Sequence, residues 1–177
     1  VAYNYDPENS ISIDADGSYK FTGSDVAILK VNGDNFPSLA LSKSNLALST
    51  GSNVTILGYP GDAEALTDPR FSTVTITGGK ITSLKYASGS SYKLLQTDAS
   101  IDHGNSGGPA LTDNGEVIGI ATYAYTGSSG GTFNYLRDVK DLIDLLDKNN
   151  INYSKSYMYT FLPLVNSWAA NDLYNLS

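Results

Sequence analysis

Short runs of β-forming residues, separated by turn signals, occupy most of the sequence between residues 10 and 136. Runs such as DVAILKV (25–31) are too short and too rich in branched side chains to be helices. The dipeptide Asn114-Gly115 is the strongest short signal for a β-hairpin. Many short strands at this spacing predict an all-β fold built from barrels or a sandwich.

The positions of the runs predict individual strands. We expect a hairpin over 10–21 that turns around Ala15, Asp16 and Gly17, followed by a buried strand over 25–31. Further strands are expected at 37–41, 53–60, 72–77, 79–86, 91–98, 108–112, 116–125 and 131–136.

The segment 137–150 has a different pattern. Val139, Leu142, Ile143 and Leu146 have the spacing of one helix face, so we expect an amphipathic helix that docks on the β core. Residues 151–177 are rich in aromatic side chains, and we expect an appended tail there. That tail either covers exposed strands or offers a partner surface through a cluster of Tyr157, Met158, Tyr159, Phe161, Leu162 and Trp168.

Composition excludes several classes of function. A net charge of −7 with only 11 Lys and Arg argues against binding to nucleic acid or to an anionic membrane. The chain has no cysteine and one histidine, so disulfides and thiolate catalysis are excluded and no metal or other cofactor is expected. No long apolar run predicts a membrane span. The first residues, VAYNYDPENS, lack signal-peptide features and are expected to be a mature end or a cut within a longer protein.

Two acidic segments resemble cation sites only superficially. Residues 14–17 lack the ligand series of a calcium loop, so a hairpin turn is the better interpretation. Asp62, Glu64 and Asp68 are expected to form a solvated surface loop.

The chemistry-bearing segment is SIDHGNSGGPAL (100–111). A serine hydroxyl becomes a useful nucleophile only when a base takes its proton and donors stabilise the oxyanion. The glycines around Ser106 allow the backbone N–H groups of Gly104 and Ser106 to point at one spot. Each such donor contributes about 3–4 kcal/mol in acyl transfer. The alternative is an ordinary glycine-rich turn that happens to hold a serine.

The segment QTDASIDHGNSGGPAL with GEVIGIATYAY (96–125) resembles the nucleophile region of trypsin-like serine proteases, in particular the bacterial HtrA-like and glutamyl-endopeptidase-like branches. GSDVAILKV (23–31) resembles the strand that carries the family's catalytic aspartate, and NVTILGYP with TITGGKITSL resembles the strands that open its second barrel. The resemblance covers about 25–148.

This resemblance implies a double β-barrel of which the first barrel is only partly present. Residues 1–50 would be its remaining strands, 51–136 the second barrel, 137–150 the C-terminal helix and 151–177 an appended tail.

The resemblance also implies a role for each matched residue. Ser106 would be the nucleophile, Gly104 with Ser106 would form the oxyanion hole, and Asp25 would orient a histidine. The family's histidine precedes the aspartate, yet none lies before Asp25 here, so we expect an upstream segment to supply it and this chain alone to be inactive. His103 would approach from the substrate side and is expected to be a rim residue rather than the base.

Two further expectations come from the alignment with the family. Asn105 stands where many relatives have an activation aspartate, so an N-terminal activation switch cannot operate. The pocket for the residue before the cleaved bond carries no charge and predicts a small or apolar preference; its lining would be Ser100, Ile101, Ala121, Thr122 and Tyr123.

We therefore expect a bacterial serine endopeptidase that acts on proteins or peptides through an acyl-enzyme at Ser106. We also expect a secreted or extracytoplasmic location, which the many Tyr, Gly, Ser, Thr and Asn residues fit. One alternative is a catalytically dead, protease-like binding module. Another is an unrelated β-rich adhesin or carbohydrate-binding domain. Unpaired strand edges make an upstream segment or a dimer partner a further expectation.

Overall fold

The computed structural model describes residues 2–4, 11–13, 15, 19–21, 25–33, 35–43, 48–61, 68, 73–86 and 93–154. The expectations for the tail beyond Ser154, for most of the acidic loop and for the Asp16-Gly17 turn lie outside these residues.

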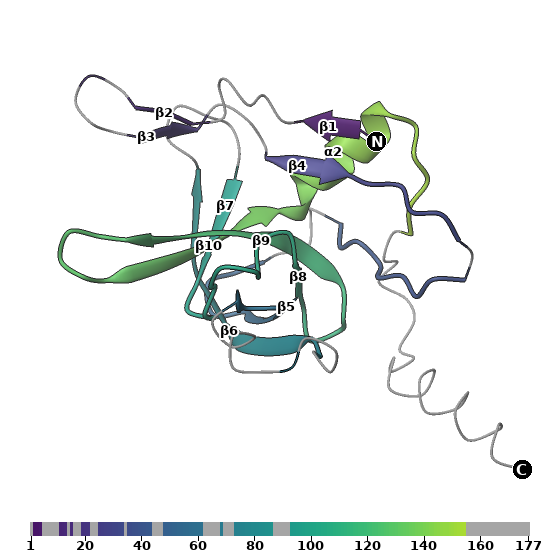
Figure 1. The fold of residues 1–177 in the computed structure, drawn as a ribbon. Helices are drawn as coiled ribbons and strands as arrows, with labels where there is room; N and C mark the ends of the chain where they lie inside the picture. Colours follow the sequence, from purple (N-terminus) through teal and green to yellow (C-terminus); the bar gives the residue numbers. More distant parts are fainter. Residues whose placement is uncertain are drawn as a thin grey trace, which may run out of the picture.

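Six antiparallel strands close into a barrel, in the order β10-β7-β6-β5-β8-β9 (Figure 1). This architecture confirms the predicted all-β class. The strands are β5 (Asn53–Gly58), β6 (Thr75–Tyr86), β7 (Lys93–Thr97), β8 (Pro109–Leu111), β9 (Val117–Thr126) and β10 (Thr132–Asp138).

The chain before the barrel forms two small sheets. β2 (Ile11–Ile13) pairs with β3 (Tyr19–Phe21), which confirms the hairpin predicted over 10–21. β1 (Ala2–Asn4) pairs with β4 (Val26–Ile28), and Figure 1 shows both strands beside the helix rather than in the barrel wall.

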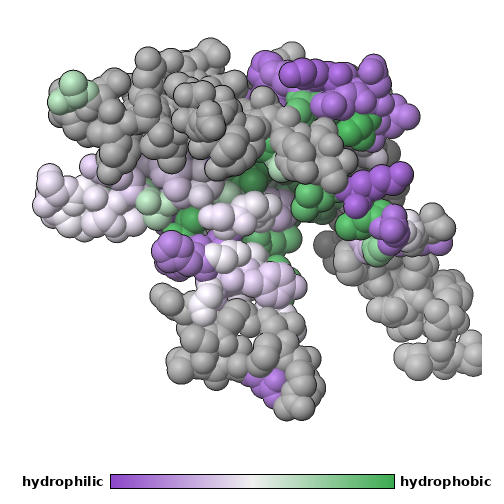
Figure 2. All heavy atoms as spheres, turned by 45° about the horizontal axis from the view of Figure 1, so that its top comes forward, coloured by the Kyte–Doolittle hydropathy of each residue, from purple (hydrophilic) through white to green (hydrophobic). Residues whose placement is uncertain are grey.

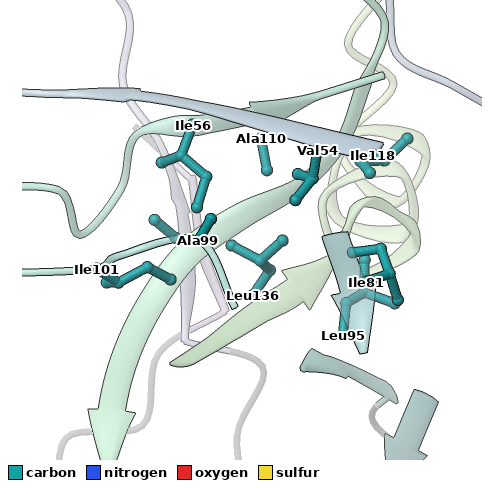
Figure 3. Close-up of a cluster of buried hydrophobic side chains, with 10 residues drawn as sticks. Val54, Ile56, Ile81, Leu95, Ala99, Ile101, Ala110, Ile118 and Leu136 are labelled. Carbon is teal, nitrogen blue, oxygen red and sulfur yellow. The ribbon is translucent and has the colours of Figure 1, made fainter. Parts of the chain in front are cut away.

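Aliphatic side chains from every barrel strand and from the loop after β7 fill the barrel interior (Figure 3). Ile81, Leu95, Ile118 and Leu136 are completely buried. Each such side chain contributes about 1.5–3 kcal/mol by leaving water. Fully buried positions alternate with less buried ones along β5, which is the pattern of a strand with one face on a core.

The helix α2 (Val139–Lys148) follows β10 directly. It begins after Asp138, whose side chain accepts the Lys140 N–H at 2.9 Å and caps the first turn. Its predicted apolar face docks on β4 and on the start of β9, forming a second cluster: Leu41, Val117, Val139 and Leu146 with Ile28, Leu111, Leu142, Ile143 and Tyr153.

Two strand predictions were wrong because the glycine pair Gly78-Gly79 does not form a turn. Residues 75–77 of the first run and all of the second run, 79–86, belong to one strand, β6, which pairs with β5 through both glycines. A side chain at Gly79 would collide with the backbone of Ala99. The glycine is therefore explained by a close backbone approach inside a continuous strand.

The strand predictions for 25–31 and 37–41 were also wrong in extent. β4 ends at Ile28, and Leu29 and Val31 are exposed, because β1 is the only described strand that pairs with β4. Residues 37–41 form no strand and touch the sheet through a single bridge from Leu41 to Val117.

An apolar groove of about 540 Å³ remains between these segments and α2. Its walls include Leu29, Leu39, Leu142 and Tyr153. Figure 2 shows hydrophobic atoms at the surface of this part of the molecule. Among the described residues, no helix is long and apolar enough to cross a membrane.

An ion pair lies buried where β10 meets α2. Arg137 is 2% exposed and its Nη1 lies 3.8 Å from Asp141 Oδ2. Burial raises the pKa of Asp141 to about 6 from its ordinary 3.8, although the Arg137 charge pulls that pKa down. Between these two values the folded state holds a proton that the unfolded state has released.

We predict that the free energy of unfolding falls as pH rises from about 4 to about 6.5, by on the order of 2 kcal/mol from Asp141. In Asp141→Asn this part of the slope disappears because the group no longer titrates. Urea unfolding followed by circular dichroism at several pH values measures it. Asp113→Asn, at an exposed position outside α2 and not among the charges that act on Asp141, is the control and keeps the part of the slope that comes from Asp141. An unchanged slope in Asp141→Asn contradicts the assignment.

Candidate active site

Ser106 lies in a tight turn between the loop that follows β7 and the start of β8. The Asn105 N–H donates to the Asp102 carbonyl at 3.0 Å, and the Gly108 N–H donates to the Asn105 carbonyl at 2.9 Å. The side chain of Ser106 is exposed, and its Oγ donates to the Thr122 carbonyl at 3.0 Å. The turn therefore presents its serine at the surface, against β9.

Two peptide groups of this turn have their directions fixed by hydrogen bonds on the carbonyl side. The His103 carbonyl accepts the Gly61 N–H at 2.6 Å, and the Asn105 carbonyl accepts the Gly108 N–H. In a planar trans peptide the N–H points opposite to the C=O. The N–H groups of Gly104 and Ser106 therefore point away from those partners, and neither donates to an acceptor in the described part of the chain. Backbone N–H groups that have no acceptor of their own are the kind of donor that can stabilise an oxyanion.

The end of β5 forms the surface on which this turn rests. A side chain at Gly104 would collide with the Tyr59 carbonyl, and one at Gly108 would collide with the Leu57 carbonyl. Gly58, between them, has no room for a side chain because Asn105 packs against it. Gly104 also has φ +102°, which favours glycine. Close backbone contact thus explains the glycines that flank Ser106.

The structure also describes Asp25, expected to orient the histidine, and His103, expected to be a rim residue. Asp25 is exposed just before β4, with φ 44°, and forms no hydrogen bond with Ser106. His103 is exposed; its carbonyl is held by Gly61, but no hydrogen bond connects its ring with Ser106 Oγ. The described residues therefore contain no base in contact with the nucleophile.

The residues expected to line the substrate pocket differ in exposure. Ile101 and Ala121 are buried and belong to the barrel core, while Thr122 and Tyr123 are half-buried. Ser100 is exposed, and its Oγ donates to Asp102 at 3.3 Å. The specificity inferred for this pocket stays a prediction.

Tyr123 has an aromatic neighbour on β10. Its ring centroid lies 5.1 Å from that of Tyr135, with the two planes tilted by 31°. Burial raises the pKa of Tyr123 to about 12, against the pull of the Arg137 charge. The phenol is therefore neutral throughout the physiological range. In the described part of the chain, no group of three acidic or histidine side chains could hold a metal ion.

Sequence reasoning did not assign the segment 57–61 or the Thr122 carbonyl to the site. GYPG (58–61) carries a usable signal, because two glycines so close to a strand end indicate close backbone approach. The Thr122 carbonyl has no signal, since a backbone acceptor is independent of residue type.

A family model described as "Trypsin-like peptidase domain" matches residues 4–120, which is more than half of the chain. The chain therefore belongs to the trypsin-like peptidase domain family. This membership excludes the unrelated adhesin or carbohydrate-binding domain as an alternative.

Particular relatives lie in the HtrA and DegP branch. The chain is 41% identical over 110 residues to a "Probable periplasmic serine endoprotease DegP-like" of Hahella chejuensis, covering 60% of this chain and 21% of the relative. It is 38% identical over 144 residues to "Protease Do-like 2, chloroplastic" of Arabidopsis thaliana, covering 78% and 22%. Among solved structures it resembles "HtrA-type protease AlgW with decapeptide", with TM-score 0.57, 27% identity and coverage of 78% of this chain and 43% of that one. The chain spans about a fifth of the length of these curated relatives.

Gly104→Ala and Gly107→Ala test the contact between the turn and β5. Both positions have left-handed backbone, φ +102° and +85°, so each alanine costs about 1–2 kcal/mol in strain. Only at Gly104 does the new methyl group meet a backbone carbonyl; Gly107 has open space. We predict that Gly104→Ala loses about 1–3 kcal/mol more stability than Gly107→Ala in urea unfolding. Equal losses would show that backbone strain alone explains these glycines.

Proposed function

We propose that this chain is the catalytic portion of a serine endopeptidase in which Ser106 forms the acyl-enzyme. The observation that carries the proposal is the pair of fixed N–H groups beside an exposed serine. Family membership supports it, as do relatives named serine endoproteases.

In the proposed reaction, Ser106 Oγ attacks the carbonyl carbon of the peptide bond while a base takes its proton. The N–H groups of Gly104 and Ser106 stabilise the oxyanion that forms. The C–N bond then breaks, the amine leaves with the proton, and water hydrolyses the acyl-enzyme. We propose that the base is a histidine outside these 177 residues and that Asp25 orients it. Without that base, turnover falls by on the order of 10⁶-fold, so this chain alone is nearly inert.

We propose that the substrate is a peptide segment that adds to β9 as an antiparallel strand. β8 accompanies β9 only as far as Ile120, and β10 lies along the other side. From Ala124 to Thr126 no described strand pairs with the β8 side of β9. A peptide strand gains main-chain hydrogen bonds at such a position. A small or apolar residue before the cleaved bond remains part of the proposal.

The division of the chain and its location are also proposals. Residues 1–50 would be the remaining strands of a first barrel, 51–136 the second barrel, 137–150 the C-terminal helix and 151–177 a tail. The closed barrel over β5–β10 supports this division. An extracytoplasmic location is supported by the periplasmic relatives.

A catalytically dead binding module is the second candidate. The observation in its favour is the hydrogen bond from Ser106 Oγ to the Thr122 carbonyl, which directs the hydroxyl proton to a group that cannot act as a base.

Labelling with a fluorophosphonate, followed by intact mass, tests the proposed nucleophile. We expect negligible adduct on the chain alone and clear acceleration by added imidazole, which supplies the missing base from solution. Ser106→Ala should give no adduct under either condition, whereas Ser83→Ala should behave as wild type.

Two outcomes contradict the proposal. An adduct that persists in Ser106→Ala means that Ser106 is not the nucleophile. Labelling at the rate of a working protease without imidazole means that the chain already holds a base, for which His103 is the first candidate. Failure of imidazole to accelerate labelling favours the dead binding module.

A further inference from the structure

The groove between β4, the segment 37–41 and α2 is apolar and carries no charge. None of its lining residues is Lys, Arg, Asp or Glu, in a chain whose net charge is −7. Leu29 and Leu39 in its walls are 73% and 42% exposed, and Val31 and Phe36, close to them in the sequence, are more than half exposed. Apolar surface gathered in one stretch marks an interaction site. We refer to this feature as the apolar groove.

The end of α2 directs the chain that follows it into the apolar groove. Asn150 has φ 54°, in the left-handed region, and its N–H donates to the Asp147 carbonyl at 3.1 Å. The Ile151 N–H donates to the Leu146 carbonyl at 3.0 Å. These two hydrogen bonds form a Schellman motif, which ends the helix and turns the chain off its axis. Residues 152–154, beyond this motif, line the groove.

Two hydrogen bonds hold the chain in the wall of the groove up to its last described residue. The Leu41 N–H donates to the Ser154 carbonyl at 3.0 Å, and the Tyr153 hydroxyl donates to Asp147 Oδ1 at 3.0 Å. Leu41 is itself connected to the barrel, because it forms a bridge with Val117 at the start of β9. The chain that follows Ser154 therefore starts from a fixed point beside the groove.

The sequence after Ser154 has the same chemistry as the apolar groove. No Lys, Arg, Asp or Glu occurs from 156 to 171, and this stretch holds Tyr157, Met158, Tyr159 and Phe161. These residues lie outside the described part of the chain. Since a chain extends by at most about 3.6 Å per residue, Tyr157 cannot be more than about 11 Å from Ser154. Aromatic side chains are thus available within a few residues of the groove.

We propose that the apolar groove is an intramolecular docking site for the tail and that the segment 156–162 fills it. A volume of about 540 Å³ is in the range of pockets that enclose a drug-sized molecule, so the groove has room for aromatic side chains. Apolar side chains that enter it leave water, which is favourable. The inference is independent of the proposed function, because it involves neither Ser106 nor the peptide position along β9.

Chain connectivity favours the tail over a second copy of the chain as the occupant. A segment joined to the wall of its own site through a short connection has an effective concentration in the millimolar range. A second copy at micromolar concentration is therefore at a disadvantage of about a thousandfold. The two occupants give different products in a cross-linking experiment.

Disulfide cross-linking is a direct test because the chain has no cysteine of its own. In the double variant Leu39→Cys with Tyr159→Cys, one thiol lies in the groove wall and the other in the tail. Leu39 is partly exposed, so the fold should be retained, and circular dichroism checks this. The reduced variant, at micromolar concentration, is oxidised with oxidised glutathione and followed by non-reducing electrophoresis and intact mass. We expect a cross-linked monomer.

Lys148→Cys with Tyr159→Cys is the matched control. Lys148 is exposed and does not line the groove. It is within reach of the tail, because the neighbouring Asp147 accepts the hydrogen bond from Tyr153. We expect the Leu39 pair to cross-link about tenfold faster than the Lys148 pair, since docking concentrates the tail thiol at the groove. Adding Tyr157→Ser and Phe161→Ser to the Leu39 pair should remove this advantage.

Four results overturn the inference. Equal rates for the two pairs, or an advantage that survives Tyr157→Ser with Phe161→Ser, mean that apolar docking does not direct the tail. A disulfide-linked dimer as the main product of the Leu39 pair assigns the groove to a second copy. Absence of a cross-link in the Leu39 pair leaves the groove to a segment from outside these 177 residues. None of these results changes the outcome of labelling at Ser106.

Discussion

The backbone contact between the end of β5 and the turn around Ser106 is the constraint on which the site depends. Gly104 and Gly108 lie directly against the carbonyls of Tyr59 and Leu57, and Gly61 holds the His103 carbonyl. No side chain takes part in these contacts, so they have little conformational freedom to lose. The barrel supplies the rigidity: β5 is paired on both sides, by β6 and β8, and its inner face is buried in the core.

The sequence predicted the all-β class, the hairpin over 10–21 and the helix face because each depends on local periodicity or turn chemistry. The choice of a barrel over a sandwich came from the family resemblance. It failed at Gly78-Gly79, where the same residue type that makes turns was needed inside β6 for the approach of Ala99. It also failed at Leu29 and Val31, since a run of branched residues predicts an extended chain but not whether another segment covers it. Burial of this kind is decided by tertiary packing.

The candidate site shows the same difference between features that local sequence patterns predict and features that depend on tertiary contacts. The motif around Ser106 predicted that the N–H groups of Gly104 and Ser106 are free to donate, because glycine spacing and backbone geometry are linked directly. Their role as oxyanion donors stays a prediction. The Gly61 anchor and the Thr122 carbonyl were not identified, because backbone groups leave little trace in the sequence. The turn that holds Ser106 rests on the backbone at the end of β5, whereas no described histidine or carboxylate is hydrogen-bonded to Ser106 Oγ.

β9 contains one more residue than β10 between the pairs Leu136–Ala121 and Tyr135–Tyr123, and that extra residue is Thr122. Ala121 before it is buried in the barrel core, whereas Tyr123 after it is only half-buried. The bulge therefore uncouples the two parts of the strand, because the residues beyond it no longer have to satisfy the packing of the barrel. The surface of the β9–β10 hairpin beyond the bulge is therefore independent of the packing of the barrel. Mutations can vary the chemistry of this surface at little cost to the folding of the barrel.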